Sequence, residues 1–341
     1  MPGFWDTLLA NLQPLIDPAV KLITALPAPA TPLWLVILMP FAAVIALALR
    51  TPRQLLRFRY RRVFGLLVAA RYFQHKSHRL DLIMTAGNIG VFAMAGSLAI
   101  VSVATVHAAT HSTLIALFGT PTPTTLSTTT ISLTWSVALF LAYEFAYWLD
   151  HYLSHKIPFL WEFHKVHHSA EVLSPITNFR VHPVDSIVFI NIIVLCTGLT
   201  TALLTFGFGM GRIKIEMWGV MSVVGAVVGL ASQLQHSHVW LPLSGWLGRV
   251  ILSPAHHQIH HSVAREHHDR NFGNMFGVFD WLFGTLSIPP KQRPKLVFGV
   301  DSLPNPEHDM KEALVTPFIE AARHLAPKPA APKPDASQAT A

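Results

Sequence analysis

The chain has 341 residues, of which 51% are hydrophobic and 13% are charged, and its formal net charge is +7. Soluble domains usually carry about 25% charged residues, and the mean hydropathy of this chain is +0.42, so the composition predicts a membrane protein rather than a soluble one. Nine Lys or Arg residues lie between Arg50 and Arg79, directly after an apolar run. This placement favours contact with a membrane surface over nucleic-acid binding.

Cys196 is the only cysteine, which excludes an intrachain disulfide, a multi-cysteine zinc site and an iron–sulfur cluster within one chain. The first residues, MPGFWDTLLANLQPLID, show no basic region followed by an apolar core. They therefore predict no cleaved signal peptide.

Five segments approach the length of about 20 mostly apolar residues that a transmembrane helix needs. None of them contains Lys or Arg, and the third and fifth run directly into clusters of histidine. Residues 1–30 form a Pro-broken lead-in, and the final APKPAAPKPDASQATA predicts a disordered tail. The five predicted spans are residues 32–49, 82–106, 131–149, 186–206 and 218–234.

The charge pattern predicts how these spans are oriented. The basic Arg50–Arg79 segment should be cytoplasmic, whereas the segment His107–Thr130 has no Lys or Arg and should face the other side. Counting spans from there places residues 150–185 and 235–341 together on the cytoplasmic side. Arg212 and Lys214, in the opposite loop, weigh slightly against this orientation.

Histidine is the most informative residue type in the chain. Fourteen of the 20 histidines fall in two short stretches, which contain one H-x-x-x-H box and two H-x-x-H-H boxes. The first stretch contains His151, His155, His164, His167, His168 and His182. The second contains His236, His238, His256, His257, His260, His261, His267 and His268.

The spacing of the boxes indicates metal binding. Residues i, i+3 and i+4 share a helix face, and neutral imidazole is a common metal ligand. Surface decoration would not explain three such boxes on one predicted side of a membrane. An all-nitrogen set suits iron, zinc, copper or nickel, and this many imidazoles suggests more than one ion.

Other chemistries find less support in the sequence. It contains no H-E-x-x-H motif, no P-loop and no G-x-G-x-x-G, so neither a zincin protease nor a nucleotide site is predicted. A metal-transporting or metal-sensing membrane protein is the main alternative, although transport requires polar residues at mid-membrane. Within the predicted spans Glu144 is the only obvious acid or base. A haem-binding electron carrier would need only one or two of the histidines.

At these residues the chain resembles the fatty acid hydroxylase and sterol desaturase superfamily of integral-membrane di-iron proteins. The resemblance covers roughly Thr134–Leu286. It rests on the strings EFAYWLDHYLSHKIPFLWEFHKVHHSAE, NFRVHPVD, QHSH, SPAHHQIHHS and HHDRNFGNMFGVFDWLFGT.

The resemblance implies a set of metal ligands and supporting residues. His182 and His268 fall in elements whose histidines are either ligands or orienting groups, and His238 has a weaker claim. Glu144 is expected either to orient a ligand histidine through its second ring nitrogen or to form an ion pair, and Arg180 and Asn271 are further candidates for support. The implied ligands are His151, His155, His164, His167, His168, His236, His257, His260 and His261.

A few positions depart from the family pattern. Tyr152 stands where many members have Arg, Glu144 where many have Asp, and Phe279-Asp280 where many have Trp-Asp. None of these departures removes a ligand, but they leave the substrate and the subfamily open. For Arg180 the residue pattern favours a structural ion pair over a lipid headgroup contact.

The sequence therefore predicts an all-α integral membrane protein with four or five transmembrane helices and a cytoplasmic, histidine-rich helical cap. We expect a membrane region at residues 1–130, a catalytic domain at 131–290 and a C-terminal extension at 291–341. The resemblance implies two iron ions, which zinc could replace in the isolated protein, and dioxygen as co-substrate. It further implies hydroxylation or desaturation of a bilayer lipid, sterol-like or fatty-acyl, with electrons from a separate donor protein and no nucleic-acid partner.

Overall fold

The computed structural model describes residues 74–93, 99–210, 234–300 and 309–325. Regular structure within these ranges is helical, and only isolated β-bridges occur beside the helices. This confirms the all-helical prediction for the described part of the chain. In chain order the helices are α6 (Lys76–Ala93), α8 (Val103–Phe118), α9 (Thr128–Lys156), α10 (Pro158–His168), η2 (Pro175–Phe179), α11 (Pro183–Gly207), α13 (Leu247–Val250), α14 (Pro254–His260), η3 (Arg265–His267), α15 (Val278–Leu282) and α16 (Met310–Leu325).

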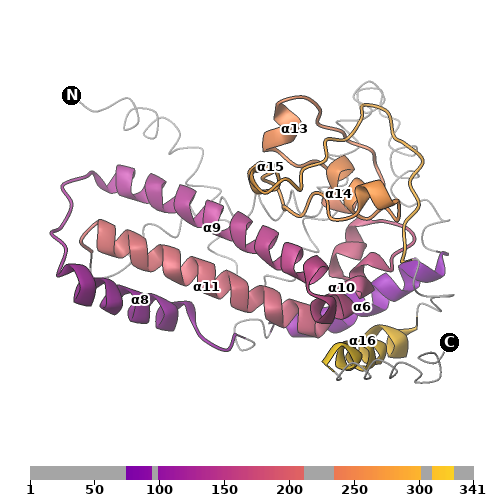
Figure 1. Cartoon of the computed structure of the whole chain (residues 1–341), viewed down its shortest axis with the longest axis horizontal. Coiled ribbons are helices and arrows are strands. Elements are labelled where there is room, and N and C mark those ends of the chain that lie inside the picture. Colours follow the sequence, from indigo (N-terminus) through magenta and orange to yellow (C-terminus); the bar gives the residue numbers. More distant parts are fainter. Residues whose placement is uncertain (1–73, 94–98, 211–233, 301–308, 326–341) are drawn as a thin grey trace, which may run out of the picture.

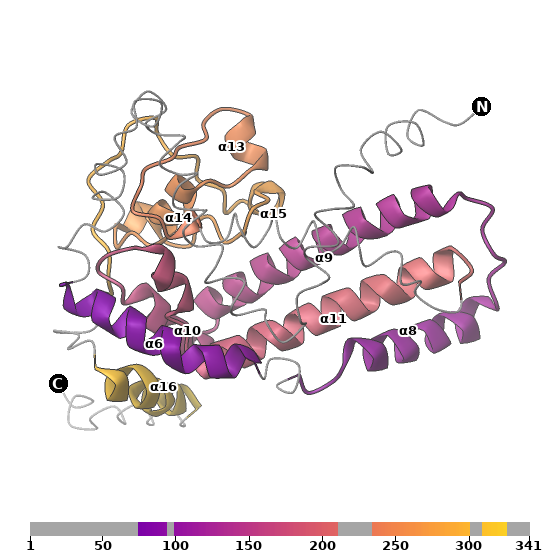
Figure 2. The ribbon, with the colours of Figure 1, turned by 180° about the vertical axis from the view of Figure 1, so that it is seen from behind.

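Helices α8, α9 and α11 form an elongated bundle, and most of the other elements gather at one end of it (Figure 1). We call this gathered end, made of α6, α10, α13, α14, α15 and α16, the cap; Figure 2 shows it from behind. α11 packs along both α8 and α9. α9 and α11 are antiparallel, since Ile131 packs near Leu204 at the far end and Tyr147 meets Phe189 near the cap.

Two helices of the bundle are long and apolar enough to cross a membrane: α9 with 29 residues and α11 with 25. They contain the predicted spans 131–149 and 186–206, so both of these predictions are confirmed as long apolar helices. At about 1.5 Å per residue, each exceeds the roughly 30 Å of a bilayer core.

The predicted span 82–106 is wrong as a single helix. α6 is described as far as Ala93, residues 99–102 are not helical, and a new helix, α8, begins after Ser102, whose hydroxyl accepts a hydrogen bond from the Thr105 amide. The side chain of Asn88 donates to the carbonyls of Phe179 and Val181 and so holds α6 in the cap. A hydropathy profile holds no information about such hydrogen-bond partners. The expected loop 107–130 is likewise a helix as far as Phe118, followed by a short connection at the far end of the bundle.

A sharp bend between α9 and α10 folds two histidine boxes together. Ile157 is extended, with φ −96° and ψ 110°, and Pro158 is the first residue of α10. Proline disfavours the helical conformation in the residue before it and has no amide to continue α9, yet it suits the first position of a helix. The chain therefore reverses direction directly after His151 and His155.

Several predictions lie outside the described residues. These are the spans 32–49 and 218–234, most of the basic 50–79 segment, the lead-in 1–30 and the tail from residue 326. The total of four or five spans stays a prediction. In the C-terminal extension the structure adds α16, which packs on α10 and which the sequence analysis did not foresee.

Candidate metal centre

Nine histidines converge at the junction of the bundle and the cap, and they are the nine that the sequence analysis selected. They form two groups, and within each group the candidate ligand atoms lie within 4.8 Å of one another. The five-histidine group contains His151, His155, His164, His168 and His260. The four-histidine group contains His167, His236, His257 and His261.

Helical periodicity explains how the H-x-x-H-H boxes are divided between the groups. On α10, His164 and His168 are four residues apart and join the five-histidine group. His167 lies about 100° around the helix axis from His168 and joins the four-histidine group. In the second H-x-x-H-H box the assignment to the two groups is the opposite. There His257 and His261 join the four-histidine group and His260 joins the other. Each box therefore contributes to both groups and ties them together.

Four of the nine histidines, His168, His236, His257 and His260, are held in the neutral form. Burial, followed by neighbouring imidazoles, lowers the pKa of His168 and His257 well below 6.5. The same causes lower the pKa of His236 to about 3, and burial lowers that of His260 to about 3. Desolvation opposes the charged form of a buried base, so these rings keep a lone pair available at neutral pH.

The arrangement of ring nitrogens fits bound cations. In the four-histidine group the Nε2 atom of His236 lies 2.9 Å from that of His167 and 2.8 Å from that of His257. In the five-histidine group the Nε2 atom of His168 lies 3.1 Å from that of His155 and 3.0 Å from that of His260. A neutral imidazole carries one N–H, so hydrogen bonds cannot satisfy all of these contacts, whereas a shared cation can.

Two further nitrogens of the five-histidine group face inward without a partner. The Nε2 atoms of His151 and His164 are buried and have no hydrogen-bond partner among the described residues. Buried polar atoms are normally satisfied. Both are therefore suited to bind a metal ion.

The opposite nitrogens of three of these rings are held by oxygen atoms. His164 Nδ1 lies 3.0 Å from the Asp185 carboxylate, His151 Nδ1 lies 2.8 Å from the Phe272 carbonyl, and His260 Nδ1 lies 2.7 Å from the Arg270 carbonyl. An acceptor at Nδ1 fixes the tautomer and directs Nε2 toward the metal. In the four-histidine group, by contrast, the Nδ1 atoms of His236, His257 and His261 have no hydrogen-bond partner among the described residues.

The sequence analysis missed Asp185 and the two carbonyls. Asp185 was visible as the acid that follows the histidine of the V-H-P-V-D string, in the first turn of α11. The carbonyls had no signal of their own, because every residue has one. Only the path of the 270–274 turn selects them.

That turn is held by Asn271 and Asp280. Asn271 has a positive φ of 57° and donates through its side chain to the carbonyls of His256 and Ser287. Asp280 accepts hydrogen bonds from the amides of Phe272 and Gly273, both at 2.8 Å. Asn271 therefore supports the site indirectly, by placing the carbonyls on either side of it.

Glu144 plays a different part from the one expected. Its carboxylate accepts from the amides of Met275 and Phe276 and from the side chain of Asn274. Both carboxylate oxygens are therefore engaged by the 274–276 segment. The prediction that Glu144 orients a histidine or forms an ion pair is corrected: it anchors the cap to α9.

The remaining candidate histidines lie outside both groups. His182 caps α11, accepting from the Val184 amide and lying 3.2 Å from the Leu314 carbonyl, so both of its ring nitrogens are engaged. His268 is exposed, with its Nε2 atom 3.2 Å from the Val263 carbonyl. His238 also stands apart from the groups. None of the three is placed as a ligand.

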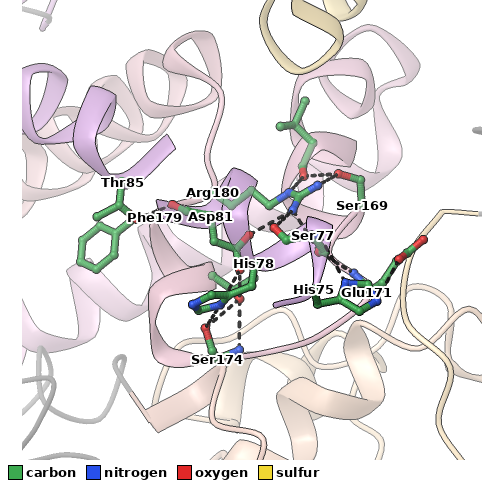
Figure 3. A network of polar contacts seen from close by, with 12 residues as sticks. His75, Ser77, His78, Asp81, Thr85, Ser169, Glu171, Ser174, Phe179 and Arg180 are labelled. Carbon is green, nitrogen blue, oxygen red and sulfur yellow. Dashed lines mark hydrogen bonds and ion pairs between the residues drawn. The ribbon is translucent and has the colours of Figure 1, made fainter. Parts of the chain in front are cut away.

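Arg180 is fully buried in a polar network that joins α6 to the end of α10 (Figure 3). It donates to the Asp81 carboxylate at 3.0 Å, to the Val166 carbonyl at 3.0 Å and to the Ser169 hydroxyl at 2.8 Å. Asp81 also accepts from the Thr177 hydroxyl. The expected structural ion pair is therefore present, and it holds the residues on either side of His167 and His168.

A cavity of about 350 Å³ opens beside the five-histidine group. His155, His168 and His260 form part of its wall, together with Trp161 and Val263. A reactant in this space would lie against the candidate ligands.

Comparison with known proteins matches residues 136–285 to the family described as fatty acid hydroxylase. This region contains all nine histidines, but it excludes α6, α8 and α16. No solved structure matches the chain.

Curated relatives also match part of the chain. Ornithine lipid hydroxylase OlsE of Rhizobium tropici is 28% identical over 152 residues, which are 43% of this chain and 40% of that protein. Alkylglycerol monooxygenase of Homo sapiens is 24% identical, over 49% of this chain and 33% of that protein. The Caenorhabditis elegans enzyme of the same name is 25% identical, over 48% and 29%.

The match thus spans less than half the length of each of these relatives. The family match, at residues 136–285, coincides with the region that carries both histidine groups. Residues 136–285 therefore match the fatty acid hydroxylase family, in agreement with the resemblance that the histidine boxes carry.

Proposed function

We propose that this protein is a membrane-bound, metal-dependent monooxygenase that hydroxylates a lipid. The observation that carries the proposal is the division of nine converging, largely buried histidines into two adjacent groups. We assign one iron ion to each group, with His151, His155, His164, His168 and His260 as ligands of one and His167, His236, His257 and His261 as ligands of the other. Zinc would fit the same nitrogen ligands but would not support redox chemistry.

The overall reaction is a balanced monooxygenation. A lipid C–H bond, dioxygen, two electrons and two protons give a C–OH group and water. Dioxygen is reduced, the carbon is oxidised, and a separate electron-donor protein supplies the electrons. The bound metals would supply the activation of dioxygen.

The protein's own residues hold the metals and exclude water. The neutral imidazoles would hold the ions without compensating their positive charge. The burial of His167 and His261 keeps bulk water from the four-histidine group. Asp185 and the carbonyls of Arg270 and Phe272 fix the ring orientations, and the cavity beside His155 offers room for a reactant.

The relatives suggest the substrate class and the outcome. Their names specify an ornithine lipid and an alkylglycerol, both amphiphiles with a polar head and a long chain. We therefore place a bilayer lipid of that kind as the substrate and favour hydroxylation over desaturation. The cap, with the metal centre, is assigned to the cytoplasmic face.

Lipid mass spectrometry under ¹⁸O₂ tests this function. Cells that express the wild-type protein should gain a lipid heavier by one ¹⁸O atom, and the purified protein should contain iron. The double variant His167→Ala/His260→Ala removes one ligand from each group and should abolish both signals. His111→Ala, on α8 and outside both groups, is the matched control.

Three outcomes would contradict the proposal in different ways. A product lighter by two hydrogens would indicate desaturation. Iron binding without any lipid product, together with metal flux across vesicles, would indicate the transport alternative. If the double variant bound as much metal as the wild type, the proposed ligand assignment would be wrong.

A further inference from the structure

The cap exposes an apolar surface that the proposed reaction does not use. We call it the aromatic patch; it lies on α13 and α15 and the residues next to them. Trp246 is 75% exposed and Trp281 61% exposed, which is unusual for the largest apolar side chain. The patch consists of Trp246, Leu247, Ile251, Trp281, Leu282 and Phe283.

The two parts of the patch form one surface. α13 contacts α15, Ile251 forms a β-bridge with Phe276, and the Gly277 amide donates to the Val250 carbonyl. Gly277 permits this approach, since a Cβ atom there would lie 2.9 Å from the Arg249 carbonyl oxygen. The patch is therefore a defined surface and not two separate loops.

The patch lies beside a candidate membrane-spanning helix. Phe283 stacks on Trp148 with ring centroids 4.4 Å apart, and Phe279 lies 5.3 Å from Phe145. In Figures 1 and 2, α13 and α15 lie nearer to the middle of α9 than α14 does. One to two turns further along α9, Leu141 and Val137 are exposed as well, so apolar surface continues from the patch onto the helix.

The charges around the patch suit a lipid surface. Residues 239–252 contain no acid and a single basic residue, the exposed Arg249. In residues 276–288 the only charged side chain is Asp280, which is fully buried and accepts hydrogen bonds from the amides of Phe272 and Gly273. Tryptophan favours the membrane–water interface, and a nearby arginine can reach lipid phosphates.

We propose that the aromatic patch inserts into the interfacial layer of the bilayer, on the side of the membrane where the cap lies. This inference rests on the membrane location in the proposed function. It adds a second attachment beside α9 and α11, and it would place the metal centre close to the lipid headgroups.

Single-cysteine labelling in proteoliposomes tests the patch. Cys196→Ser provides a background without cysteine, into which Trp246→Cys or Trp281→Cys is introduced and labelled with an environment-sensitive fluorophore. The control is Glu266→Cys, at an exposed polar position in the same cap. The vesicles are phosphatidylcholine with phosphatidylglycerol, and the quenchers are nitroxide-labelled lipid and aqueous iodide.

We expect lipid nitroxide to quench the Trp246→Cys and Trp281→Cys labels several-fold more than the Glu266→Cys label, with the reverse order for iodide. Iodide quenching equal to the control would overturn the patch as a membrane contact. Protection from both quenchers would overturn it too, in favour of a protein partner or a second copy of the chain.

Iron content and ¹⁸O incorporation measured on the same background separate this inference from the proposed function. An active, iron-containing enzyme with labels exposed to iodide would refute the patch alone. Embedded labels on a protein without iron or lipid product would refute the proposed reaction alone.

Discussion

Asp185 is the only carboxylate whose oxygen lies within hydrogen-bond distance of one of the nine histidines among the described residues. Its Oδ2 atom is 3.0 Å from His164 Nδ1, while Ser154 donates to its other oxygen. The ring is thereby fixed with Nε2 facing the other members of its group. In the proposed centre this makes Asp185 a positioning residue for the five-histidine group.

Asp185→Asn should weaken metal binding at the five-histidine group by about 10-fold to 100-fold, because acceptors of this kind commonly contribute that much to metal affinity. Competition with a chelator measures the effect. Asp309→Asn, on an exposed carboxylate at the start of α16, should leave the affinity unchanged. Equal affinity in both variants would show that Asp185 does not act through His164.

The lowered pKa values also predict a pH dependence for the metal-free protein. An imidazole in the unfolded chain takes up a proton below about pH 6.5, whereas His236 and His260 in the fold resist protonation until about pH 3. Their stabilising contribution is therefore complete above pH 6.5 and is lost progressively as the pH falls toward 3. Each group changes the free energy of unfolding by up to about 1.4 kcal/mol per pH unit.

Thermal unfolding of the chelator-treated protein between about pH 7 and about pH 5 measures this slope. His236→Gln removes one titrating group and should give a shallower dependence. A slope identical to the wild type would mean that His236 does not contribute.

At the scale of elements, α6 is the support that lies outside the family match. Asp81 binds Arg180, which in turn holds the Val166 carbonyl and the Ser169 hydroxyl on either side of His167 and His168. Asn88 holds the next stretch of chain, at Phe179 and Val181. The candidate metal centre is therefore supported by a helix that precedes the matched residues.

Asp81→Asn should destabilise the protein by about 3–5 kcal/mol, because it leaves a buried guanidinium without its counter-ion. Thermal unfolding in detergent measures the loss. The double variant Asp81→Asn/Arg180→Met removes both charges and should recover part of it. Glu320→Gln, which breaks an exposed ion pair with Arg323, should change stability by less than about 1 kcal/mol.

At the scale of the whole molecule, α10 and α14, which carry histidines of both groups, and the α8–α9 connection lie at opposite ends of the bundle (Figure 1). If α9 and α11 cross the membrane, these two ends face opposite compartments. The charge pattern predicts that the cap end is cytoplasmic.

A membrane-impermeant maleimide tests this orientation in intact cells. In the Cys196→Ser background, Thr125→Cys lies in the exposed connection between α8 and α9 and should be labelled from outside. Glu266→Cys, in the cap, should be labelled only after lysis. The opposite order would reverse the orientation, and equal labelling would argue against a spanning bundle.

The sequence predicted the two long apolar helices because length and hydropathy are local properties. It did not predict the break between α6 and α8, because the polar contacts of Asn88 and Asp81 that hold α6 join residues about 90 positions or more apart. α16 escaped prediction for a similar reason. Its place depends on contacts with α10, such as that of Phe318 with Phe163.

The sequence by itself determined which nine histidines to group, because helical spacing selects the eight histidines of the three boxes and the family resemblance adds His236. Only the tertiary structure decided how they divide. The bend at Pro158 and the opposite placement of the two H-x-x-H-H boxes send His167 to one group and His260 to the other. Spacing along a helix defines which side chains share a face, but what that face meets depends on how distant helices pack.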